Sequence, residues 1–149
     1  MGYGDPNKDI PGVRAWYVGD MPFISCASPA YIRRFGVPHS PRDCLNHIGL
    51  TYSSALRHPA RELVKGDRHA PLEWKRTIAF HSVLAMKSAL MIGAGISVDM
   101  SLYHNWQELK EGTLVPVLDG WSVPTKACFT FAQEDSLQTC LLYTSPSPR

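Results

Sequence analysis

The apolar and polar positions from residue 77 to residue 98 predict a strand, a helix and a second strand. Ile78 and Phe80 alternate with polar or small residues, which is the period-two pattern of a pleated strand over residues 77–81. Ser82 has a side chain preferred at helix N-caps. The residues from Val83 to Ile92 are mostly apolar, so we expect a largely buried helix there.

Two glycines follow this helix and are expected to end it. Glycine adopts the positive φ that helix C-termini often need, and Gly93 and Gly95 are both in place. The apolar run 96–98 suits a short buried strand. Together these elements form an α/β crossover unit. Its helix N-terminus offers free N–H groups at the carboxyl edge of a sheet, where open α/β folds usually bind ligands.

Upstream, serine-proline pairs mark two helix starts. An apolar strand is expected over residues 23–27, and Ser28 with Pro29 then supplies an N-cap followed by a proline at the first helical position. This helix should run to Phe35 and stop at Gly36. The same pair recurs at residues 40–41 and predicts a second short helix to about Asn46.

The remaining segments before residue 77 have weaker patterns. Residues 1–22 are rich in Gly, Pro and Asp and are interpreted as a connecting segment. Alternation over residues 48–52 predicts a strand. Residues 53–71 are polar and indicate a surface excursion, with a helix from Pro59 to Lys65. Leu72 and Trp74 should then resume a strand.

Beyond residue 98 the pattern predicts one helix and two strands. The helix has an apolar stripe at i, i+4 and i+7, made of Leu102, Trp106 and Leu109, and should end at Gly112. The strand over residues 113–118 contains Pro116, so it should lie at a sheet edge or carry a bulge. Residues 127–131 alternate as another strand. The end of the chain, 141–149, is expected to be disordered.

Composition excludes several classes of protein. The chain has 149 residues, 44% of them apolar and 19% charged, as in ordinary globular proteins. The net charge of +2 is spread without a basic run, which argues against a nucleic-acid-binding surface. We find neither an export leader nor an apolar run approaching the ~20 residues needed to span a bilayer, so a cytoplasmic location is expected. The four cysteines lack CxxC spacing and indicate reduced thiols.

Several short motifs occur together in a characteristic order. The run Cys-Ala-Ser-Pro-Ala-Tyr-Ile at 26–32, followed by Gly-Val-Pro at 36–38, Ser-Pro-Arg-Asp-Cys-Leu at 40–45 and His47, resembles the start of the second effector lobe of LysR-type transcriptional regulators. Gly-Ala-Gly-Ile at 93–96 resembles that family's glycine pair. Residues 112–118 with Trp121 resemble its return into the first lobe. The resemblance covers about residues 20 to 124.

This resemblance implies an α/β fold of the periplasmic-binding-protein-like type II class, with a mixed sheet and helices on both faces. It implies that residues 1–22 are a remnant of the first effector lobe and the crossing segment, 23–98 the second lobe, and 99–135 the return into the first lobe. Residues 136–149 resemble nothing in the family and are interpreted as a disordered or non-native tail. The family's helix-turn-helix domain, which reads DNA, lies outside this sequence, so the chain is interpreted as a fragment.

The resemblance also implies effector contacts at five residues. Residues at the family's strand-to-helix junction commonly face the cleft between the lobes, so Ser82 is expected to contact an anionic group of the effector, although it could be a helix cap alone. His81 is either a second contact or an ordinary surface histidine. Met21 and Pro22 match the crossing between lobes, where hinge packing is the alternative. Ser97 completes the expected set.

Catalytic and metal sites find little support in the sequence. The acidic residues fall in separate predicted elements, and no nucleophile stands beside a base. Cys44 and His47 could form half a metal site, but no second pair lies at a plausible spacing, so no metal or cofactor is expected.

We therefore predict a non-catalytic ligand-sensing domain. A small organic acid or related metabolite would bind between the lobes, and the whole regulator would be a homodimer or homotetramer contacting DNA only through its other domain. The alternatives are a solute-binding protein of a transport system, which would need an export signal, and an enzyme with a related sheet. The sequence does not specify the effector.

Overall fold

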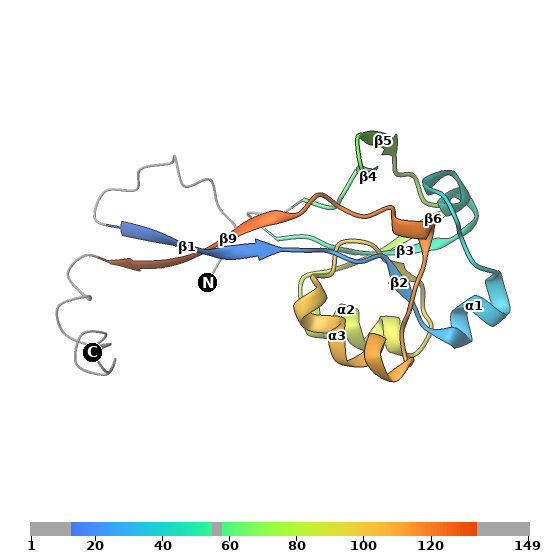
Figure 1. Cartoon of the computed structure of the whole chain (residues 1–149). Coiled ribbons are helices and arrows are strands. Elements are labelled where there is room, and N and C mark those ends of the chain that lie inside the picture. Colours follow the sequence, from blue (N-terminus) through green and yellow to red (C-terminus); the bar gives the residue numbers. More distant parts are fainter. Residues whose placement is uncertain (1–12, 55–57, 134–149) are drawn as a thin grey trace. The chain divides into compact units, whose positions relative to one another are not determined.

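The computed structural model describes residues 13–54 and 58–133 (Figure 1). These residues belong to two compact units. Unit 1 contains residues 13–21 and 126–133, and unit 2 contains residues 22–125 except for 55–57. The predicted tail at 136–149 lies outside the described residues.

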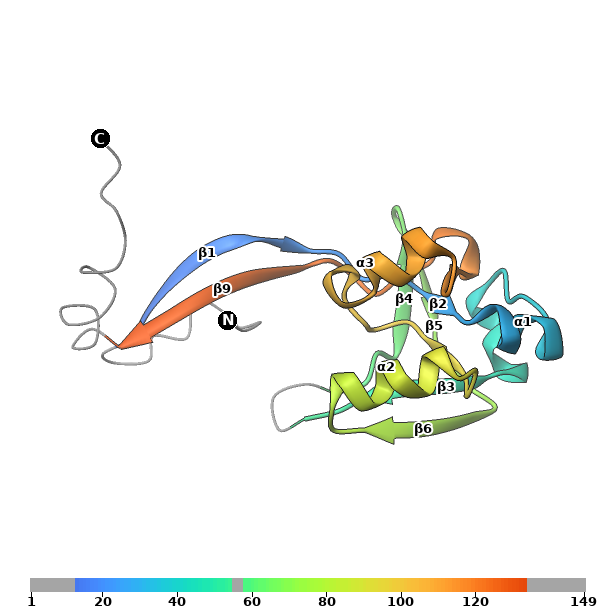
Figure 2. The same ribbon diagram turned by 90° about the horizontal axis from the view of Figure 1, so that it is seen from below.

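Unit 2 is built on a five-stranded mixed sheet with the strand order β6-β3-β7-β2-β8. Figure 2 shows β6 next to β3, with α2 (Val83–Met91) lying over them. The strands are β2 (Cys26–Ala27), β3 (Ile48–Tyr52), β6 (Arg76–Phe80), β7 (Ile96–Ser97) and β8 (Val115–Pro116). β3 pairs in parallel with β6 and β7, whereas β2 pairs antiparallel with β7 and β8. The predicted strand at 23–27 is thus shorter than expected. The proline-containing strand lies at a sheet edge, as predicted.

Helix α2 (Val83–Met91) connects β6 to β7, which confirms the strand-helix-strand unit. Both strands run parallel to β3, which lies between them. The two glycines after α2 have different roles. Gly93 has a φ of 82°, which suits the end of a helix. Gly95 instead allows close strand packing, since a Cβ there would lie 2.6 Å from the carbonyl oxygen of Ile48.

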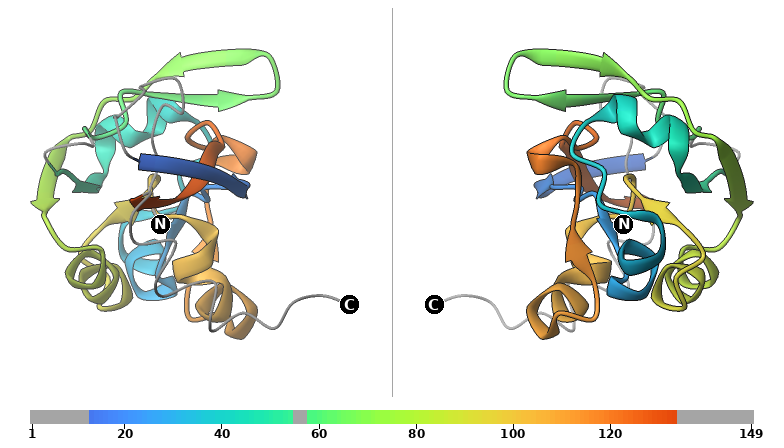
Figure 3. Two further views of the ribbon diagram at one scale, coloured as in Figure 1. Left: turned by 90° about the vertical axis from the view of Figure 1, so that its left-hand side faces the viewer. Right: turned by 90° about the vertical axis from the view of Figure 1, so that its right-hand side faces the viewer.

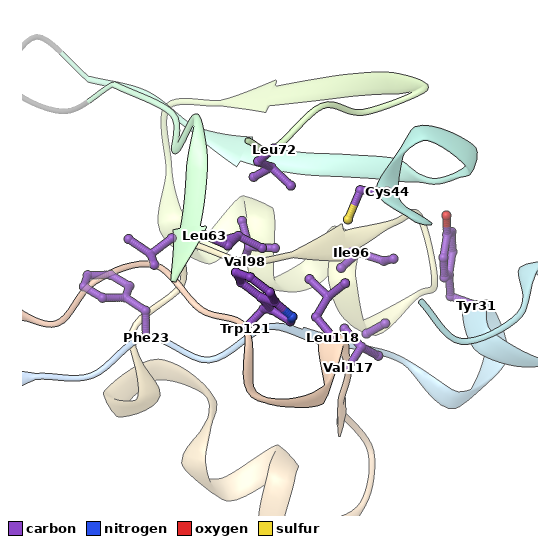
Figure 4. Packing of buried hydrophobic residues seen from close by; sticks show 12 residues of the cluster. Phe23, Tyr31, Cys44, Leu63, Leu72, Ile96, Val98, Val117, Leu118 and Trp121 are labelled. Atoms are coloured by element: carbon purple, nitrogen blue, oxygen red, sulfur yellow. The ribbon is translucent and has the colours of Figure 1, made fainter. Parts of the chain in front are cut away.

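Helices cover both faces of the sheet, and each face has its own hydrophobic cluster. On one face, Met86 and Leu90 of α2 pack in a cluster with Cys26, Leu50, Met100 and Leu114. On the other face lie Tyr31 of α1 (Pro29–Phe35) and Cys44 of the 3-10 helix η1 (Pro41–Asn46). Figure 4 shows the side chains of this second cluster, including Ile96 of β7. Both serine-proline helix starts are confirmed.

The expectation that α2 is largely buried is wrong. Only Met86 and Leu90 of this nine-residue helix are buried. Leu84 is 70% exposed, and Ile92, which follows the helix, is 81% exposed. A helix lying on one face of a sheet buries one stripe of residues four apart, whatever the composition of its outer side.

Helix α3 (Leu102–Glu111) ends as predicted at Gly112, which has a left-handed backbone. The predicted apolar stripe does not mark the most buried face of this helix. Trp106 is 54% exposed, and the fully buried residue of this helix is Asn105. The side chain of Asn105 therefore faces the interior, and the pattern of apolar residues could not predict the burial of this polar side chain.

The segment predicted as a polar excursion with a helix is a β-hairpin. β4 (Glu62–Lys65) and β5 (Arg68–Pro71) pair antiparallel, and Figure 3 shows them on the side of unit 2 away from α2 and α3. Gly66, with a φ of 58°, forms the turn instead of ending a helix. Leu63 is fully buried. The strand expected at residues 72–74 is also absent from the described structure.

Unit 1 is a two-stranded antiparallel ribbon of β1 (Val13–Met21) and β9 (Lys126–Gln133). Its register shifts between Tyr17 and Gly19. The region interpreted as a connecting segment thus contains a strand over residues 13–21, and the predicted strand at 127–131 is confirmed. Within the described part of the chain, no helix is long and apolar enough to cross a bilayer.

Candidate functional site

Polar residues follow two neighbouring parallel strands at the carboxyl edge of the sheet. Ser53 comes directly after β3, and His81 with Ser82 come directly after β6. The Ser53 backbone N–H donates to the carbonyl of Phe80 at 3.0 Å. These side chains therefore share the edge of the sheet where open α/β folds usually bind ligands.

The ring of His81 is held in one orientation by a hydrogen bond. Its Nδ1 lies 3.0 Å from the carbonyl oxygen of Ser53. Because a carbonyl oxygen can only accept, Nδ1 carries the hydrogen, and Nε2 stays available for another partner. The His81 side chain is exposed.

Ser82 is exposed and caps α2. Its Oγ accepts a hydrogen bond from the Ala85 backbone N–H at 3.3 Å, and its carbonyl accepts from the Met86 N–H at 3.0 Å. The N–H groups of Val83 and Leu84 precede this first intrahelical bond, so they point outward from the helix end. Since the Ser82 Oγ acts as an acceptor toward Ala85, its own hydrogen can be donated to a ligand.

Ser97 is on the same sheet but is fully buried. In β7 it pairs with Leu50 and Cys26, whose side chains belong to the cluster beneath α2. Among the described residues its Oγ has no hydrogen-bond partner. The structure thus brings together His81, Ser82 and Ser53, and places Ser97 in the interior.

The two predicted crossing residues are the neighbours at which the chain passes from unit 1 to unit 2. Met21 is the last residue of β1 in unit 1, pairs with Lys126 and is half-buried. Pro22 is the first residue of unit 2 and is exposed. The Pro22 carbonyl accepts a hydrogen bond from the Leu102 N–H at 2.9 Å, so the first turn of α3 holds this residue.

Sequence reasoning missed Ser53. The available signal was a polar serine directly after the strand pattern at 48–52, since parallel strands bring their carboxyl ends to one edge. Asp99, which follows β7, is also nearly fully buried. No hydrophobic pattern indicates a buried carboxylate.

The described residues contain no group of three His, Cys, Asp or Glu side chains arranged to hold a metal ion. Cys44 is a buried free thiol, and burial raises its pKa to about 12. His47 uses its Nδ1 in a hydrogen bond with the Tyr31 hydroxyl. Of these two side chains, Cys44 is therefore a buried thiol that burial keeps protonated, and His47 is held by Tyr31.

Comparison with known proteins places this geometry in a family. The LysR substrate binding domain matches residues 1–141. The HTH-type transcriptional regulator YhjC of Escherichia coli, which is uncharacterised, is 30% identical over 113 residues. That match covers 74% of this chain and 37% of the relative, so the chain spans little more than a third of that protein's length.

Solved structures share the fold at lower identity. The regulatory domain of CrgA, a LysR-type transcriptional regulator from Neisseria meningitidis, has a TM-score of 0.73 at 23% identity, over 95% of this chain and 68% of that one. The regulatory domain of AphB in Vibrio vulnificus has a TM-score of 0.67 at 20% identity, over 85% of this chain and 62% of that one.

The chain belongs to the LysR substrate-binding domain family of transcriptional regulators. The expected periplasmic-binding-protein-like α/β fold, with a mixed sheet and helices on both faces, is confirmed.

Proposed function

We propose that this chain is the ligand-sensing part of a LysR-type regulator and binds a small organic acid or related metabolite. The observation that carries the proposal is the group of His81 and Ser82, both exposed, with the half-buried Ser53 beside them at the N-terminus of α2. It lies at the carboxyl edge of a sheet in a chain of this family.

The chemistry of this edge favours an anionic group. The Ser82 hydroxyl and the N–H groups of Val83 and Leu84 are donors, and the helix N-terminus adds a partial positive charge. A carboxylate of the effector would complement these donors, which is the basis for naming an organic acid. In the tautomer that carries its hydrogen on Nδ1, His81 Nε2 is an acceptor and would receive a hydrogen bond from a hydroxyl group of the same ligand.

In the proposed mechanism, unit 2 is the second effector lobe, and β1 and β9 lead toward the first. Met21 and Pro22 would lie at the crossing, and Ser97 remains a predicted contact from within the lobe. A ligand that binds one lobe arrangement more tightly shifts the population toward it. That shift would change the spacing of the DNA-reading helix-turn-helix domains in a homodimer or homotetramer.

The proposed protein is cytoplasmic, is not an enzyme and self-associates. Exposed apolar side chains support the self-association, namely Ile78, Leu84 and Ile92, with exposed fractions of 42%, 70% and 81%. A solute-binding protein of a transport system and an enzyme are the competing classes. The match to an HTH-type regulator favours the regulator over both.

The test replaces Ser82 in the complete regulator. Glycine is itself an acceptable N-cap, so Ser82→Gly should cost only a few tenths of a kcal/mol in stability. Loss of one hydrogen bond to a charged group costs about 1.5–3 kcal/mol, so a reporter titrated with a panel of carboxylates should need roughly ten to a hundred times more effector.

The matched control is Ser88→Ala on the same helix. The Ser88 hydroxyl is exposed and donates to the carbonyl of Leu84, one turn earlier in the helix. It does not contact the free N–H groups at the helix N-terminus. Its response curve should equal that of the parent. A Ser82→Gly curve that also equals the parent curve would leave Ser82 as a cap only and remove the main support for the proposal.

A further inference from the structure

Helices α2 and α3 are joined by a pair of opposite charges. Lys87 Nζ of α2 lies 2.6 Å from Glu108 Oε1 of α3 and also donates to the His104 carbonyl at 2.7 Å. The two charged side chains are mostly shielded from water, with exposed fractions of 25% and 17%. The hydrogen bond from Lys87 lowers the pKa of the Glu108 carboxyl, so this carboxyl is ionised at neutral pH.

The first turn of α3 in turn holds the residue at which the chain enters unit 2. The Leu102 N–H donates to the Pro22 carbonyl at 2.9 Å. Ser101 Oγ and His104 Nδ1 lie 2.8 Å apart in the same turn. Lys87 thus donates to the carbonyl of His104. The His104 side chain contacts Ser101 in the first turn of α3, and the same turn bonds Pro22.

The other contacts between these helices and the sheet are mainly apolar. Met86 and Leu90 of α2 share a hydrophobic cluster against which Leu109 of α3 packs. Apolar contacts are non-directional, so they tolerate small sliding of one helix on the other. Charge-assisted hydrogen bonds fix both distance and direction. Among the described contacts, the bonds of Lys87 to Glu108 and His104 are thus a directional connection between the two helices.

We propose that the Lys87–Glu108 pair couples the N-terminus of α2 to the segment at Pro22. A change at the Ser82 end of α2 is passed to α3 through Lys87 and reaches Pro22 through the Leu102 hydrogen bond. Lys87 and Glu108 are positioning residues in this scheme, because neither lies at the exposed edge with Ser82. A role of this coupling in regulation rests on the proposed effector site at Ser82. The coupling itself can be measured without any effector.

The experiment is hydrogen exchange on the whole chain, read at two backbone amides. Ser82→Ala removes the cap and should speed exchange at Met86, in the first turn of α2, by about fivefold, as expected for a cap worth ~1 kcal/mol. With the pair intact, exchange at Leu102 should also become at least about twofold faster. In a Lys87→Met background, the Ser82→Ala effect should persist at Met86 and vanish at Leu102.

Three variants separate coupling from general destabilisation. Glu108→Gln should abolish the Leu102 effect like Lys87→Met, whereas Lys87→Arg should retain it because the charge pair is preserved. Lys110→Met is the control, since Lys110 lies on the outer face of α3 over the Trp106 ring.

An equal Leu102 response with and without Lys87 would overturn the proposal, and so would no Leu102 response in the otherwise unchanged chain. Failure of the effector site would show instead in the Ser82→Gly reporter titration, which does not involve Leu102. The two proposals therefore fail separately.

Discussion

The hydroxyl of Tyr31 lies 3.2 Å from Nδ1 of His47, and both side chains are buried. The same hydroxyl accepts the Ile48 backbone N–H at 3.0 Å. The hydroxyl still has its own hydrogen, which it can donate to an unprotonated Nδ1. This network ties α1 to the start of β3, and burial favours the neutral form of His47 by lowering its pKa.

Tyr31→Phe should lower the free energy of unfolding by about 1–3 kcal/mol, measured by urea titration. The substitution leaves Nδ1 of His47 and the Ile48 N–H without the hydroxyl, and an unsatisfied buried polar group carries a cost of this size. Tyr103→Phe is the control, because Tyr103 is 72% exposed, and its change should stay within about 0.5 kcal/mol. Equal effects of the two substitutions would contradict the role of the network.

The free energy of unfolding should decrease as the pH is lowered below about 6.5, because His47 then takes up a proton more readily in the unfolded chain. Burial disfavours the imidazolium and lowers the pKa of His47 from its ordinary 6.5, against a smaller opposing effect of Asp43. The unfolded chain therefore binds this proton more readily. The contribution to stability is complete above 6.5 and is lost as pH falls toward the lower folded value.

The measurement is urea unfolding at about pH 7.5 and about pH 5.5. His47→Gln removes the titrating group, so the loss of stability between the two conditions should be smaller in the variant. The pKa of Asp43 is lowered by the N–H groups of His39 and Ser40, so this carboxylate titrates below the window used. An unchanged difference would show that other groups cause the pH dependence.

Features fixed by local chemistry could be predicted from the sequence. The caps at Ser28 and Ser82 and the left-handed helix end at Gly112 depend on a few neighbouring residues, and all three are present. The hairpin at β4 and β5 was mistaken for a helix although its two-residue Gly-Asp turn is a local hairpin signal. The bridge from Val64 to Ser122, which is distant in sequence, holds the hairpin against the rest of unit 2. A local pattern carries no information about such a partner.

The outer face of α2 illustrates a second limit. Leu90 and Ile92 are both large and apolar, yet Leu90 is fully buried and Ile92 is 81% exposed. The direction of each side chain follows from where the helix lies on the sheet. Composition alone therefore predicted the helix and its ends but overestimated its burial.

Leu90→Ala should cost about 2–5 kcal/mol in urea titration, because it leaves a cavity in the cluster with Met86 and Leu50. Ile92→Ala, two positions on, removes an exposed side chain and should change stability by less than about 0.5 kcal/mol. A cost below about 1 kcal/mol for Leu90→Ala would mean that the cluster is not packed as described.

Gly49→Ala should destabilise the chain by about 1–3 kcal/mol, because the added Cβ would overlap the Trp74 ring, 2.7 Å from its Cγ. Trp74→Leu should relieve part of this clash. The double variant should therefore cost less than the sum of the single variants. Gly95→Ala offers a contrast, since its obstacle is the Ile48 carbonyl, which is backbone and cannot be replaced. Strict additivity of Gly49→Ala and Trp74→Leu would contradict the contact.

The sequence predicted only the two site residues that stand between a predicted strand and a predicted helix. His81 and Ser82 could be recognised because they stand between a strand and a helix in the sequence. The contribution of Ser53 depends on the parallel pairing of β3 with β6, and the burial of Ser97 depends on its place between Cys26 and Leu50. Both are tertiary features.

Ser97→Ala separates a structural serine from a ligand contact. The Ser97 hydroxyl is buried without a hydrogen-bond partner among the described residues, so its removal should leave stability unchanged or raise it slightly. Ser25→Ala is the matched control, because Ser25 is equally buried but donates to the Trp121 carbonyl at 2.8 Å, and its loss should cost about 1–3 kcal/mol. If Ser97 contacts the effector, a reporter titration of the Ser97→Ala regulator should need more effector at unchanged stability. A curve identical to the parent would remove Ser97 from the effector contacts and leave the exposed edge at Ser82 and His81.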